Sequence, residues 1–146
     1  PKPLKAVISW GIIGILLTLI VQVIAGIIDH LLFKGNTNSL NTLTLMTAMR
    51  QQPGLILAIT LAAPIMEELV FRGALFGGLA QKINPYWAAL ISSLGFSLLH
   101  QDGHLIIYAA IGLCLCWLYR KTGSLYTTII SHAGMNLLVT LTYLYR

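Results

Sequence analysis

The sequence predicts an all-α protein, a polytopic bundle of about five transmembrane helices, and three observations support this prediction. Of the 146 residues, 57% belong to the hydrophobic set and 9% are charged, whereas soluble domains carry about 25% charged residues. The mean hydropathy is +0.82. Long uncharged runs alternate with short polar segments along the chain. Because this small number of charged residues cannot cover a water-facing surface, we expect the protein to lie in a lipid bilayer.

The charge balance excludes several classes of protein. Nine Lys and Arg residues against four Asp and Glu residues give a net charge of +5. We expect no nucleic-acid partner, because a protein that binds phosphates presents a much more basic face. The composition also excludes an ordinary soluble enzyme and a disordered segment. The basic residues are typical of loop charges in a membrane protein.

The first predicted span is Ala6–Ile28, an uncharged run long enough to cross a hydrocarbon core of about 30 Å. Asp29, His30 and Lys34 end this run. The polar segment Gly35–Thr44, rich in Asn and Thr, predicts an exposed loop.

Four further apolar runs predict four more spans, each bounded by Gly, Pro, Asn or charged residues. They are Leu55–Ala80, Tyr86–Leu99, Leu105–Tyr119 and Leu125–Tyr145. The third and fourth spans of the chain contain only about 14–15 residues, against about 20 for a full crossing. One interpretation is that the turn between them stops short of the far membrane surface, which would hold His100 inside the membrane.

We expect a single domain over residues 1–146, with its motif core at about 55–138 and no internal repeat. The chain begins with Pro1 rather than Met, which is compatible with a piece of a longer protein. The positive-inside rule assigns to the cytoplasm the side with more loop cations, which are Lys2, Lys5, Lys82, Arg120 and Lys121. This predicts a multi-pass protein of the cell membrane with a cytoplasmic N-terminus.

Glu67, Glu68 and Arg72 lie inside the second span, where each ionised group costs about 2.5–3.5 kcal/mol to insert. Glu68 and Arg72 are four residues apart on one helix face, so they can pair. Glu67 is turned about 100° from Glu68, so the same arginine cannot easily serve both carboxylates. A pair that only fixes helix packing needs one carboxylate. The second, Glu67, is therefore our candidate for chemistry.

Histidines follow on the later spans. His100 ends the third span, His104 lies just beyond the turn, and His132 lies four residues before Asn136 on one face of the last span. A histidine at a helix end is more often structural than functional, and we expect His104 to be a loop residue at the membrane surface. His132 and Asn136 each need a polar partner in lipid, which favours a shared site.

Two kinds of site could use these groups. Glu67, His100 and His132 could bind zinc or another divalent metal with one open position. Alternatively, Glu67 could deprotonate a water held by the histidines while Asn136 stabilises the oxyanion. No HExxH motif is present, so spacing does not decide for a metal. We estimate the depth of each residue in the membrane by counting along its span from the cytoplasmic end at about 1.5 Å per residue. The depths are about 21 Å for Glu67, about 24 Å for His100 and about 13 Å for His132, so His132 is the outlier.

Three short motifs stand on successive apolar spans. They are Glu67-Glu68-x-x-x-Arg72, Phe96-x-x-x-His100 and His132-x-x-x-Asn136. Each is weak alone, but in this order they form a fairly specific set that resembles the CPBP family. These are the CAAX-processing and bacteriocin-processing membrane proteases, also called the Abi family. The resemblance covers residues 55–138.

The resemblance implies an all-helical intramembrane endopeptidase that acts on a membrane-associated peptide or protein. Glu67 would activate the water, and His100 and His132 would assist it or hold a metal. Asn136 would complete the oxyanion site. The supporting positions would be Glu68, Arg72 and Phe96. Eukaryotic relatives remove the C-terminal tripeptide of prenylated CAAX proteins, and bacterial relatives are linked to bacteriocin maturation, self-immunity and surface-protein processing. This chain departs from the eukaryotic pattern because few spans precede its first motif.

Two non-catalytic hypotheses compete with peptide hydrolysis. A bacteriocin self-immunity or peptide-binding membrane protein would capture a peptide in the same cavity without cutting it. A proton-coupled carrier would use the carboxylates as a relay, but the sequence shows no inverted repeat or paired broken helices. We place hydrolysis first because acid, imidazole and amide groups recur on separate spans.

Overall fold

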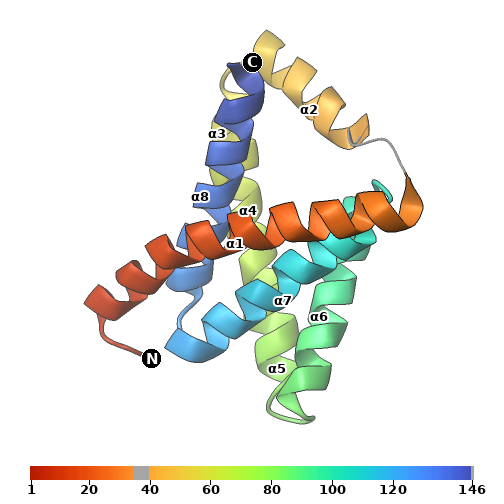
Figure 1. Ribbon diagram of the computed structural model, residues 1–146. Coiled ribbons are helices and arrows are strands. Elements are labelled where there is room, and N and C mark those ends of the chain that lie inside the picture. The colour runs from red at the N-terminus through yellow and green to blue at the C-terminus, as the bar shows by residue number, and fades with distance from the viewer. Residues whose placement is uncertain (35–39, 146) are drawn as a thin grey trace.

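The computed structural model describes residues 1–34 and 40–145, and every regular element in this part of the chain is helical (Figure 1). The long elements are α1 (Leu4–Phe33), α2 (Leu40–Gln51), a continuous helix over Leu55–Leu79 that contains α3 to α5, α6 (Pro85–His100), α7 (Leu105–Thr122) and α8 (Leu125–Leu144). The prediction of an all-α bundle is confirmed. Each predicted span corresponds to one of the long helices.

The helix α2 corrects the predicted loop at Gly35–Thr44. Residues 35–39 of that segment lie outside the described part of the chain, but residues 40–44 are helical. Leu45, Met46 and Met49 recur at helical spacing and line a cavity against α8. This helix could not be predicted from the sequence, because the Thr and Asn residues of the segment favour turns. Burial of one apolar face stabilises the helical form instead.

The outer surface of the bundle is apolar. Leu16 and Val23 on α1 are 61% and 63% exposed, and Leu98 on α6 is 63% exposed. Such a surface suits lipid rather than water. Among the described residues, α1 and α7 are the two helices that are long and apolar enough to cross a membrane, by length and composition. The count of five spans stays a prediction.

The N-terminal helix α1 packs along α7 and crosses α8 (Figure 1). Glycine residues allow α1 to approach α7 and α8 closely. A Cβ atom on Gly14 would come within 2.8 Å of Leu118 Cδ1 on α7 and would also collide with Ser131 on α8. The Ser131 hydroxyl donates a hydrogen bond to the Gly11 carbonyl oxygen at 3.0 Å. Small residues and short polar contacts of this kind join helices in lipid. This packing holds α8, which carries the third motif, in place.

The helix over Leu55–Leu79 is not a regular α-helix. It runs through α3 (Leu55–Leu57), a π-helical stretch (Ala58–Ala62), α4 (Ala63–Glu68), a second π-helical stretch (Leu69–Phe76) and α5 (Gly77–Leu79). Pro64 has no N–H group for the carbonyl four residues earlier, which accounts for a disturbed ladder just before it. The second stretch begins directly after Glu68. π-Helical turns often mark functional sites, and this helix carries the first motif.

Candidate active site

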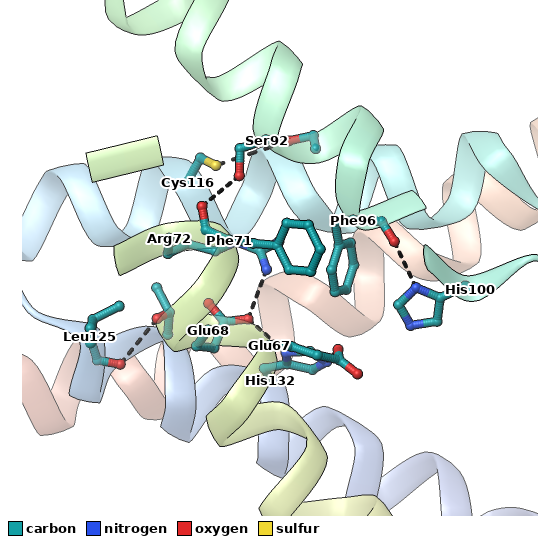
Figure 2. Close-up of polar contacts among 12 residues, drawn as sticks. Glu67, Glu68, Phe71, Arg72, Ser92, Phe96, His100, Cys116, Leu125 and His132 are labelled. Carbon is teal, nitrogen blue, oxygen red and sulfur yellow. Dashed lines mark hydrogen bonds and ion pairs between the residues drawn. The ribbon is translucent and has the colours of Figure 1, made fainter. Parts of the chain in front are cut away.

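A buried hydrogen-bonded network joins the first and third motifs (Figure 2). Arg72 Nη1 donates to Glu68 Oε1 at 3.0 Å, and His132 Nδ1 lies 2.7 Å from the same oxygen. The side chains of Glu68 and Arg72 are 0% exposed. A carboxylate paired with arginine can only accept, so His132 carries a proton on Nδ1 and presents Nε2 on its other side. The predicted pair of Glu68 with Arg72 is therefore present, and a histidine joins it.

Glu67 lies on the other side of this histidine. Its Oε2 atom is 3.7 Å from His132 Nε2, and its side chain is 21% exposed. The rotation of about 100° between successive residues gives the two glutamates different surroundings. Glu68 is enclosed by protein, whereas Glu67 opens onto a cavity. The imidazole of His132 thus lies between a buried carboxylate and an accessible one.

The ring of Phe96 lies at the centre of the three motifs. The Arg72 guanidinium carbon is 4.4 Å from the centre of this ring, a cation–π contact. The imidazoles of His100 and His132 meet it edge-on, with centroid distances of 4.7 and 5.7 Å. Phe96 is 1% exposed. One phenyl ring therefore contacts a side chain from each of the three motifs.

His100 is the last residue of α6, and a backbone carbonyl fixes its tautomer. His100 Nδ1 lies 2.8 Å from the carbonyl oxygen of Phe96 (Figure 2). Because that oxygen can only accept, Nδ1 carries the proton and donates it. The second nitrogen, Nε2, is left as a hydrogen-bond acceptor.

A cavity of about 370 Å³ brings together three of the predicted residues. Glu67, His100 and Asn136 reach it from α4, α6 and α8. A second hollow, of about 410 Å³, is also lined by Glu67 and His100. The rest of the first cavity is mostly apolar and is lined by Gln22, Thr42, Leu45, Met46, Met49, Ile59, Ala63, His104, Ile107, Tyr108, Ile111, Met135, Val139, Thr140 and Tyr143. A mostly apolar hollow with a few convergent polar groups is typical of a binding site.

The predicted site residues therefore form two connected groups. Glu67, His100 and Asn136 line the cavity, and the supporting pair of Glu68 and Arg72 lies behind it with His132. His104 lies in the connection between α6 and α7, as expected for a loop residue, but it also has contacts that the sequence did not predict. It lines the cavity, and its Nδ1 atom is 2.9 Å from Asp29 Oδ2 on α1.

The sequence leaves open a metal held by Glu67, His100 and His132. Two imidazoles and a carboxylate have the donor chemistry of a catalytic zinc site. Within residues 1–34 and 40–145, however, no three His, Cys, Asp or Glu side chains are gathered closely enough to hold a metal ion. A metal held by these three residues therefore stays a prediction, and the reaction proposed for this protein uses its side chains alone.

Ser92 is a residue of this region that the sequence does not single out. Its hydroxyl donates to the Phe71 carbonyl oxygen at 2.7 Å, across from α6 to the second π-helical stretch (Figure 2). This hydrogen bond ties α6 to the π-helical stretch that follows the two glutamates of the first motif. The signal was a small polar residue on an apolar span, which in lipid usually faces another helix.

The Ser92→Ala variant is expected to lower the free energy of unfolding by about 0.5–1.5 kcal/mol, because the buried hydrogen bond between α6 and the Phe71 carbonyl oxygen is lost. Denaturant unfolding in detergent micelles measures this loss. Ser93→Ala is the matched control: both serines are 0% exposed, but Ser93 Oγ lies 4.0 Å from Cys116 Sγ, a weak contact. Equal losses in the two variants would contradict the role given to Ser92.

Comparisons with known proteins identify the family of the chain. Residues 49–138, more than half of the chain and all three motifs, match the family described as "Type II CAAX prenyl endopeptidase Rce1-like". Over 133 residues the chain is 36% identical to "Putative membrane peptidase YdiL" of Bacillus subtilis (strain 168), covering 90% of this chain and 54% of that protein. Over 142 residues it is 32% identical to "Membrane-embedded CAAX protease MroQ" of Staphylococcus aureus (strain USA300), covering 92% of this chain and 58% of that protein.

A third relative is "UPF0177 protein YvdC" of Lactococcus lactis subsp. lactis (strain IL1403), 30% identical over 138 residues, which cover 92% of this chain and 51% of that protein. The chain thus spans a little over half of the length of these curated relatives. No solved structure matches it at a significant level. The resemblance to the CPBP proteases is confirmed, and the chain belongs to the Rce1-like family of type II CAAX prenyl endopeptidases.

Proposed function

We propose that the protein is a membrane-embedded endopeptidase in which Glu67 activates the water that attacks a peptide bond. One observation carries the proposal: Glu67 opens onto the cavity beside an imidazole, His132, whose other nitrogen is held by the buried Glu68 carboxylate. Membership of a protease family supports the same reaction class. The substrate is a membrane-associated peptide or protein.

The first chemical step uses the groups that line the cavity. Glu67 takes a proton from the water as the water oxygen bonds to the scissile carbonyl carbon. His100 Nε2, the acceptor left by the bond from Nδ1 to Phe96, holds the other hydrogen of this water. The amide N–H group of Asn136 donates to the oxyanion that forms.

In the second step the carbon–nitrogen bond breaks and the leaving nitrogen needs a proton. Because His132 Nε2 faces Glu67, it passes the proton from the carboxyl group to that nitrogen. Glu68 orients the ring and stabilises its transient positive charge, as the carboxylate of a Ser-His-Asp triad does. The second hydrogen of the water stays on the new carboxyl group and passes to the released amine, so the products are a carboxylate and an ammonium group and Glu67 is again ionised.

The surroundings of Glu67 support an internal cut in an apolar substrate. Glu67 and His100 line both the cavity and the second hollow, so there is space on two sides of the reacting bond. Apolar walls and exposed apolar helix faces suit a substrate that arrives through the bilayer. We place the protein in the cell membrane as a multi-pass protein with a cytoplasmic N-terminus.

The experiment uses the protein reconstituted in lipid vesicles and two internally quenched peptides that end in a CAAX sequence. One carries a farnesyl group on its cysteine and the other does not, because the family description names prenyl substrates. In water enriched in oxygen-18, cleavage is expected to place one heavy oxygen in the new C-terminal carboxylate, detected by mass spectrometry. Bound but uncut peptides would overturn the proposal and favour a self-immunity or peptide-binding protein. A rate that a chelator abolishes and zinc restores would contradict the metal-free mechanism.

A further inference from the structure

The two acidic residues outside the first motif also bond to groups at the cavity. The chain has four Asp and Glu residues in all, and Glu67 and Glu68 belong to the site. Asp29 bonds to His104, and Asp102 accepts a hydrogen bond from Tyr108. In a chain that carries so few carboxylates, the bonding of Asp29 and Asp102 to two residues that line this cavity needs a physical reason.

Asp102 and Tyr108 form a short connection to His100. The Tyr108 hydroxyl donates to Asp102 Oδ2 at 2.6 Å. The tyrosine ring stacks on the His100 imidazole, with 4.0 Å between centroids and 19° between planes. His100 ends α6 and Tyr108 lies in the first turn of α7, so the tyrosine reaches back across the turn.

The His100 side chain stands at the very end of α6, so the backbone after it does little to fix the imidazole ring. Gln101, the next residue, has a φ of 47°, where the helix has already ended. The hydrogen bond to Phe96 fixes one ring atom, but rotation about that contact would still swing Nε2. A flat aromatic ring against one face of the imidazole restricts this rotation.

The turn that carries Asp102 is tied at two further points. The His104 backbone N–H donates to Asp102 Oδ1 at 3.1 Å, and His104 Nδ1 lies 2.9 Å from Asp29 Oδ2 on α1. Asp102 thus bonds to the turn through one oxygen and to Tyr108 through the other. The connection from α1 to the turn, and from the turn to the tyrosine, is continuous.

We propose that Tyr108 is a positioning residue for His100: its ring fixes the imidazole plane, and Asp102 holds the ring through the tyrosine hydroxyl. The inference rests on the proposed function, in which His100 Nε2 holds the attacking water. It makes Asp102 and Tyr108 part of the catalytic geometry although neither takes a proton from the substrate.

The test measures kcat and KM for the cleaved CAAX peptide. Tyr108→Leu is expected to lower kcat by up to about 100-fold, the effect of misplacing a reacting group by about 1 Å, with KM within about twofold. Tyr108→Phe keeps the stacked ring and is expected to recover most of this loss. In an Asp102→Ala background, Tyr108→Phe is expected to cost nothing further, because both changes break the same hydrogen bond.

Tyr119→Leu is the matched control, the same change on the same helix. Tyr119 meets Phe76 edge-on at 6.0 Å and is not among the residues that line the cavity, so kcat is expected to stay unchanged. An increased KM at constant kcat in Tyr108→Leu would overturn the inference and make Tyr108 a substrate contact. Equal losses in Tyr108→Leu and Tyr108→Phe would also overturn it. Should the unaltered protein leave the peptide uncut, the proposed function itself fails, which is a distinguishable result.

Discussion

The Glu67→Gln variant is expected to lose about 10²–10⁴-fold in kcat/KM, the usual contribution of a general base. Glutamine has nearly the same shape as glutamate but cannot take a proton from water. The free energy of unfolding is expected to change little, because this side chain opens onto the cavity and lies 3.7 Å from His132, beyond hydrogen-bond distance. The peptide assay and denaturant unfolding in the same micelles measure the two quantities.

Glu67→Asp is the control for this prediction. It keeps the carboxylate but withdraws it by one methylene group, so activity is expected to lie between the parent protein and Glu67→Gln. Full activity in Glu67→Gln would contradict the role of this residue as the base. A loss of activity that follows a loss of folded protein would contradict it as well.

The local part of the site could be predicted from the sequence. Apolar runs locate every long helix except α2, since a span in lipid must satisfy its backbone internally. The pair of Glu68 with Arg72 follows from a spacing of four residues on a helix, and both side chains are fully buried together. These predictions succeed because each depends on a single continuous segment of the sequence and on no contact between helices.

The contacts between helices could not be predicted in this way. Counting along the helix axes puts Glu67 and His132 at different depths in the membrane, about 21 and 13 Å from the cytoplasmic ends of their spans. In the structure, however, the two side chains approach within 3.7 Å. Such a count assumes straight helices that start at one level, and it contains nothing about crossing angles. The bond between His132 and Glu68 spans 64 residues of sequence and likewise depends on how α8 packs.

The polar residues at the ends of spans were also hard to interpret. Asp29 and Asp102 occur where a charge commonly ends an apolar run, and His104 looks like a loop residue. In the structure these side chains bond to one another or to groups that line the cavity. A residue that ends a span and a residue that supports a site have the same sequence pattern, and only the fold separates them.

The Glu68→Ala variant is expected to lower the free energy of unfolding by about 3–5 kcal/mol and to abolish cleavage. Removal of one partner of a buried ion pair leaves the other charge uncompensated. Arg72 is 0% exposed, and its Nε and Nη2 atoms have no hydrogen-bond partner among the described residues. His132 would also lose the acceptor that orients its ring. Thermal unfolding and the peptide assay measure the two losses.

The double variant Glu68→Ala/Arg72→Met separates these two effects. Replacing the guanidinium with an apolar side chain removes the uncompensated charge, so stability is expected to recover by several kcal/mol. Activity is expected to stay absent, because His132 still lacks its carboxylate partner. Recovery of both quantities would contradict the role of Glu68 in orienting His132, and recovery of neither would contradict the buried charge as the cause. Glu68 therefore differs from Glu67, whose loss is expected to remove activity from a protein that stays folded.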